Sequence, residues 1–73
     1  MAKSIYSKDH KYLVERLKKA RKEARLHQEE VAKLLRVTQS YISKLESGQR
    51  RIDVIQLRKI VKIYKKEISY FIK

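Results

Sequence analysis

The stretch at residues 28–48, QEEVAKLLRVTQSYISKLESG, decides the fold of this chain. Its start predicts a short helix over Gln28–Leu35, because Glu29 and Glu30 stand in the first turn, where the helix dipole favours acidic side chains. The residues of this helix that we expect to face a core are Val31, Ala32, Leu34 and Leu35.

A second helix follows after only two residues, Arg36 and Val37. Thr38 supplies a side-chain oxygen for its N-cap, and Gly48 stands where a left-handed terminating residue belongs. This helix is therefore predicted to end at about Ser47. Two helices joined so closely must cross sharply, which is the geometry of a helix-turn-helix unit.

On a helical wheel, one face of this second helix is apolar and the other carries short polar side chains. The apolar residues are Tyr41, Ile42 and Leu45, and the polar ones are Ser40, Ser43, Lys44 and Ser47. Short side chains let a helix approach base edges in the DNA major groove, which is about 12 Å wide, and Gln39 can pair bidentately with adenine. Taken alone, a serine-rich face is explained equally well as a solvated surface.

The flanking segments also read as helices. Residues 9–25 carry an apolar stripe at helical spacing, formed by Leu13, Leu17, Ala20 and Ala24. Asp53 can cap a further helix over about residues 54–65, whose stripe is Leu57, Ile60, Val61 and Tyr64. The tail residues Ile68, Phe71 and Ile72 predict a short fifth helix. We therefore expect an all-α, compact five-helix domain over residues 8–73, preceded by a flexible N-terminal arm at residues 1–7.

Arg21 and Glu46 both lie at the edge of an apolar helical stripe. Charges at the edge of a core are costly unless they are paired. We therefore expect a salt bridge between them that ties the helix at residues 9–25 to the helix after Thr38.

Composition excludes several classes of function. The chain has 73 residues, enough for one small core, and no Cys, which removes disulfides and thiolate metal sites. It has no Gly-rich phosphate loop, and His10 and His27 lie on different segments without metal-ligand spacing. We expect no enzyme activity, no cofactor and no metal.

Charge points to a polyanionic partner, because 20 Lys and Arg residues stand against 8 Asp and Glu residues, a formal net charge of +12. Residues 8–25 carry 8 basic and 3 acidic side chains and residues 50–66 carry 7 and 1, whereas residues 27–47 carry 3 of each. An acidic membrane surface is the rival to nucleic acid, but the alanine-containing stripe at residues 9–25 offers little area to lipid.

The stretch Leu17–Glu46, followed by SGQRR, resembles the lambdoid phage repressor and Cro family of helix-turn-helix proteins, also called Xre-like. The features that carry the resemblance are Arg21, Gln28, Glu30, Val31, Ala32, Val37, the run QSYISKLE at residues 39–46, and Gly48. It covers about residues 13–64. Two positions depart from the family pattern: Arg36 replaces a common turn Gly, so it either adopts a left-handed conformation or the turn differs, and His27 replaces the usual Thr or Ser cap.

The resemblance implies a lambda-repressor-like fold whose third helix lies in the major groove. The residues that would then face base edges are Gln39, Ser40, Ser43 and Lys44. Those that would contact phosphates are Gln28, Tyr41, Ser47, Gln49, Arg50 and Arg51. The implied function is that of a sequence-specific transcription regulator, a repressor of bacterial, phage or mobile-element origin that acts in the cytoplasm.

We expect the partners to be double-stranded DNA and a second copy of the chain, with no small-molecule ligand and no membrane. One such domain makes few contacts, and a homodimer can recognise both halves of a palindromic operator. The predicted dimer contact is the tail, at Ile68, Tyr70, Phe71 and Ile72; the alternative is that the tail closes the core of the monomer. A variant of the same function is an antitoxin-type autoregulator that also binds a protein partner.

Overall fold

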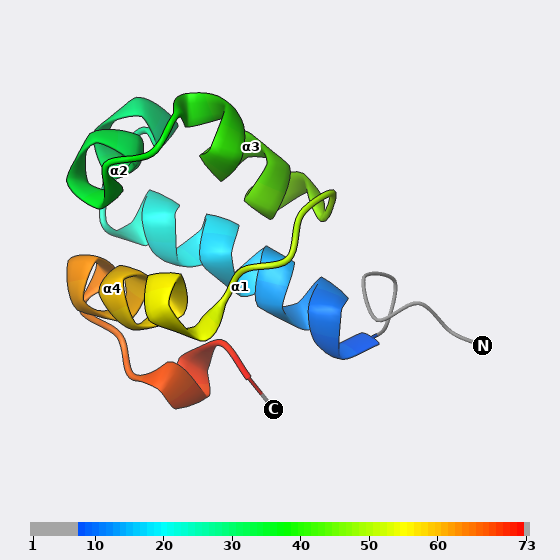
Figure 1. The fold of residues 1–73 in the computed structure, drawn as a ribbon. Helices are drawn as coiled ribbons and strands as arrows, with labels where there is room; N and C mark the ends of the chain where they lie inside the picture. The colour runs from blue at the N-terminus through cyan, green and yellow to red at the C-terminus, as the bar shows by residue number, and fades with distance from the viewer. Residues whose placement is uncertain (1–7, 73) are drawn as a thin grey trace.

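A computed structural model describes residues 8–72 of the chain (Figure 1). Within them it forms four α-helices and no strand: α1 (Lys8–Glu23), α2 (Gln28–Leu35), α3 (Gln39–Ser47) and α4 (Val54–Tyr64). The prediction of an all-α fold is confirmed. The arm expected at residues 1–7 lies outside the described residues. No helix in the described range is long and apolar enough to cross a membrane.

The predicted fifth α-helix is wrong, because the tail forms only a single 3₁₀ turn, η2 (Ile68–Tyr70). Its hydrogen bonds run from the Tyr70 N–H to the Glu67 carbonyl and from the Phe71 N–H to the Ile68 carbonyl, each at 3.0 Å. So short a segment cannot recover the cost of nucleating an α-helix. The tighter turn instead directs Phe71 into the core, where it is 0% exposed.

Side-chain and backbone caps set where the helices begin. The Thr38 hydroxyl accepts a hydrogen bond from the Tyr41 N–H at 3.1 Å, and the Asp53 carboxylate accepts one from the Gln56 N–H at 2.8 Å. At α2, the Glu30 carboxylate accepts from the His27 N–H at 2.7 Å. An acidic residue in the first turn thus supports a helix start at which the usual Thr or Ser is missing.

The structure shows the backbone conformation at Arg36, which stands where Gly is common in the family. This residue adopts the left-handed conformation, with φ of 59°, and its neighbour Val37 donates to the Ala32 carbonyl at 2.9 Å. Arg25 and Lys65 also have positive φ, and Gly48 ends α3 with φ of 83°. A side chain in this conformation costs about 1–2 kcal/mol. The turn between α2 and α3 therefore carries backbone strain at Arg36.

The core lies between all four helices and the tail. Its buried apolar residues are Leu17 and Ala20 of α1, Val31, Ala32 and Leu35 of α2, Ile42 and Leu45 of α3, Leu57, Ile60 and Tyr64 of α4, and Phe71. Leu34 was expected to face this core and does not, since 59% of it is exposed. The inward arc of the two-turn helix α2 is filled by its other apolar residues, which leaves Leu34 outside.

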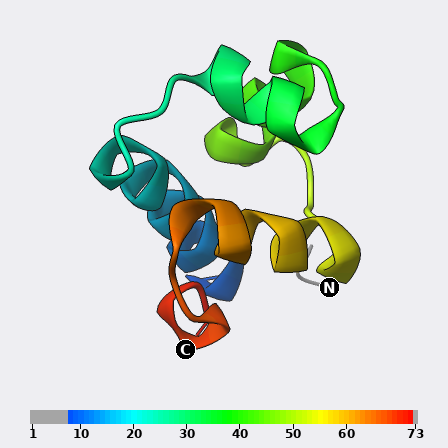
Figure 2. The same ribbon diagram turned by 90° about the vertical axis from the view of Figure 1, so that its left-hand side faces the viewer.

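The tail is also fixed to α1 by charged and aromatic side chains. The Arg16 guanidinium lies 4.8 Å from the centroid of the Tyr12 ring and 4.6 Å from that of Tyr70. Lys66 lies over the same Tyr70 ring and pairs with Glu23 at 2.8 Å. Figure 2 shows the tail against the lower side of the helices. These contacts place residues 66–71 within the monomer.

Candidate nucleic-acid interface

The outer face of α3 is polar and hollowed. Ile42 and Leu45, each 2% exposed, hold the opposite face of the helix in the core. The shallow hollow on the outer face has a volume of about 460 Å³. Its lining residues are Gln39, Ser40, Ser43, Lys44, Ser47 and Gln49. The four residues predicted to face base edges therefore share one exposed surface with two of those predicted to contact phosphates.

Under this face lies a bidentate ion pair between α1 and α3. Arg21 Nε lies 2.7 Å from Glu46 Oε2, and Arg21 Nη2 lies 3.1 Å from Glu46 Oε1. Arg21 Nη1 also donates to the Leu26 carbonyl at 2.9 Å. The hydrogen bonds to Glu46 raise the pKa of the Arg21 guanidinium, which keeps it charged although its side chain is 12% exposed. The pair fixes α3 to the body of the domain.

Two glutamines connect this ion pair to the outer face. Gln28 Nε2 donates to Glu46 Oε1 at 3.0 Å, and Gln28 Oε1 accepts a longer hydrogen bond, 3.4 Å, from Gln39 Nε2. Because a carboxylate can only accept, Glu46 turns the amide nitrogen of Gln28 inward and its oxygen toward Gln39. Gln39 keeps a carbonyl oxygen and a second N–H, the acceptor and donor that an adenine edge requires.

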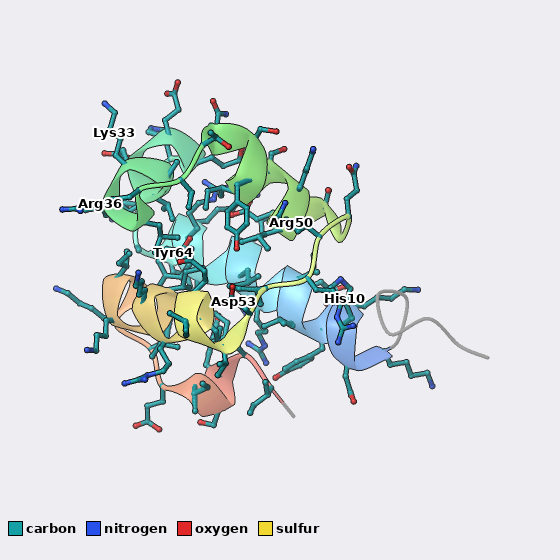
Figure 3. All side chains as sticks on the ribbon, viewed as in Figure 1. His10, Lys33, Arg36, Arg50, Asp53 and Tyr64 are labelled. Atoms are coloured by element: carbon teal, nitrogen blue, oxygen red, sulfur yellow. The ribbon has the colours of Figure 1, made fainter. Side chains whose placement is uncertain are left out.

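The loop after α3 is hydrogen-bonded to the last turn of that helix. The N–H groups of Gln49 and Arg50 both donate to the Lys44 carbonyl, at 3.0 and 3.2 Å. This brings the Arg50 guanidinium 4.7 Å from the centroid of the half-buried Tyr41 ring. Figure 3 shows Arg50 at the edge of α3. Tyr41 thus serves partly as a platform for Arg50, and both Arg50 and Arg51 are exposed.

The tail residues do not join this surface. Phe71 is buried and Tyr70 is half-buried, while Ile68 and Ile72 are 41% and 50% exposed. Sequence reasoning missed a more exposed apolar pair, Val54 at 65% and Ile55 at 62%. Their sequence signal was present, because both stand at the start of α4 and outside its Leu57–Tyr64 stripe.

A short α2–turn–α3 unit, with a hollow polar face on α3, defines the class of helix-turn-helix domains. A family model described as helix-turn-helix, of the Cro/C1 type, matches residues 17–71. The chain therefore belongs to this family, whose members are DNA-binding transcription regulators and not typically enzymes. No curated protein matches the chain. Within residues 8–72, no three His, Asp or Glu side chains are grouped to hold a metal ion.

Proposed function

We propose that this protein is a repressor that binds a palindromic operator as a homodimer, with α3 in the major groove. The observation that supports this most directly is the exposed polar face of α3, where Gln39 contacts Gln28 at 3.4 Å and Gln28 in turn donates to Glu46 at 3.0 Å. A merely solvated serine face has no need of such support from the core. An orienting network lowers the entropy lost when Gln39 meets a base.

Affinity and discrimination come from different parts of the chain in this proposal. Residues 27–47 carry 3 basic and 3 acidic side chains, so the helix-turn-helix unit itself is neutral. Phosphate neutralisation, with release of counterions, is left to the basic segments at residues 8–25 and 50–66. Base readout is left to α3.

Substitutions in these two parts are expected to differ in kind. Gln39→Ala removes one bidentate base contact and relaxes the preference at one operator position by about 1–3 kcal/mol. Arg51→Ala removes a phosphate contact, weakens all sequences alike and lowers the salt slope by about one. Anisotropy titrations against an operator found by in vitro selection, its single-base variants and several salt concentrations measure both. An equal, sequence-independent loss in the two variants would show that α3 is not the reader.

The proposed two-fold contact uses the part of the tail that stays exposed, Ile68 and Ile72. We expect the double variant Ile68→Lys/Ile72→Lys to sediment as a monomer and to lose operator affinity, because lysines of like charge would face each other across the axis. The matched control is Val54→Lys/Ile55→Lys, which changes a more exposed apolar pair and is expected to stay dimeric. The reverse result would move the contact to the start of α4.

A further inference from the structure

A second hollow lies where α1, α2 and α4 end, and it shares no residue with the hollow on α3. We call it the helix-end groove; its volume is about 590 Å³. Its apolar lining residues are Ala24, Leu26, Leu34, Ile63 and Tyr64. Figure 2 faces the side of the molecule on which α1 and α4 end.

The apolar residues that line the groove differ in exposure: Tyr64 is buried and Leu34 is exposed. Tyr64, 4% exposed, forms part of the floor, and burial raises the pKa of its hydroxyl, which therefore stays neutral. Leu26 and Ile63 are half-buried. Leu34 projects beside them with 59% of its surface exposed, although its neighbour Leu35 is 4% exposed. One exposed leucine is ordinary, but a leucine beside an apolar hollow extends a surface that a partner can cover.

The surroundings of the groove are basic. Lys65 lines it, Arg25 stands between two lining residues, and Arg36 extends outward from the end of α2 (Figure 3). In the part of the chain that the structure describes, none of these three side chains forms an ion pair with a carboxylate. Glu23, the acidic lining residue, pairs with Lys66. Three helix C-termini contribute about −1.5 charges together, which is less than these three cations supply. The rim therefore stays positive.

We propose that the helix-end groove docks an acidic amphipathic segment of another protein. Its apolar side chains would cover Leu34 and Ile63, and its carboxylates would meet Arg25 and Lys65. A second copy of this chain fits poorly, because α2 is the only described helix with more acidic than basic side chains, and its apolar face is buried in the core. Duplex DNA fits poorly as well, because its phosphates would lie against an apolar floor. Since the groove shares no residue with the α3 hollow, the partner would leave the outer face of α3 free.

The probe for this proposal is a synthetic helical peptide of about four turns with leucines on one face and glutamates elsewhere. We expect it to bind saturably, to shift the amide NMR signals of Leu26, Leu34 and Lys65, and to leave those of Ser40 and Ser43 in place. Leu34→Lys should weaken binding at least about tenfold, although it adds a favourable positive charge. Circular dichroism should show that the variant is folded, because Leu34 is exposed and lysine favours helix.

The matched control is Ile55→Lys, which also replaces an exposed aliphatic residue with lysine but lies outside the groove, and it should bind the peptide as the unmodified protein does. Three results would overturn the proposal: equal binding of a scrambled peptide of the same composition, undiminished binding by Leu34→Lys, or groove signals that move only with protein concentration or with phosphatidylglycerol vesicles. Operator binding by Leu34→Lys, measured separately, tests the repressor proposal independently of the groove.

Discussion

Replacing Phe71 with alanine is expected to destabilise the domain by about 3–5 kcal/mol. The ring is 0% exposed and is among the largest fully buried side chains of the core, and it meets the Tyr70 ring edge-on with centroids 5.1 Å apart. A domain of this size rarely has more than about 3–5 kcal/mol of stability in total. Far-UV circular dichroism at 25 °C should therefore show a largely unfolded chain, and urea unfolding of the unmodified protein gives the reference.

The control for this prediction is the adjacent residue. Ile72→Ala, at a position 50% exposed, should change the free energy of unfolding by less than about 0.5 kcal/mol. If Phe71→Ala instead kept its stability and lost only self-association, the tail would be an interface element that merely rests on the monomer.

Glu46→Ala is expected to cost about 2–4 kcal/mol, because it leaves the Arg21 guanidinium largely buried without its carboxylate. It also releases Gln28, whose amide nitrogen donates to Glu46. Urea unfolding should show a lower midpoint with an unchanged slope, since the folded state stays compact. Operator discrimination should weaken as well, because Gln39 loses its ordered neighbour.

Two comparisons separate a buried pair from an exposed one. The double variant Arg21→Met/Glu46→Leu should recover much of the lost stability, because neither charge is then left unpaired. Glu23→Ala breaks the Glu23–Lys66 pair, whose N–O distance is 2.8 Å but whose side chains are 45% and 27% exposed. It should leave the unfolding midpoint nearly unchanged. Equal losses in Glu46→Ala and Glu23→Ala would contradict this account.

Much of the fold could be predicted because its determinants are local. Cap residues and apolar spacing placed α2 and α3, and they placed the ends of α1 and α4 to within about two residues. The tail and Leu34 could not be placed this way. Whether Phe71 enters the core and Leu34 stays out depends on which volume the other helices leave open, and spacing along one helix does not contain that information.

Part of the candidate site could likewise be predicted from the sequence, and part could not. The helical wheel of α3 identified its exposed polar residues. The positions of Arg21 and Glu46 at the edges of apolar stripes predicted an ion pair, and the structure places Arg21 Nε 2.7 Å from Glu46 Oε2. The link from Glu46 through Gln28 to Gln39 joins positions 18 and 11 residues apart in the sequence. Only the packed arrangement of the helices brings such groups together.

If the protein works as proposed, the segregation of charge has a consequence for how it would search for its operator. Long-range attraction by the basic segments governs how often the protein meets DNA and how readily it slides along it, and salt weakens this attraction for every sequence alike. The neutral helix-turn-helix unit adds almost nothing to that attraction, so the contacts proposed for α3 would act on the dissociation rate. A correct operator would therefore be distinguished by how long the protein stays on it, and hardly at all by how fast it arrives.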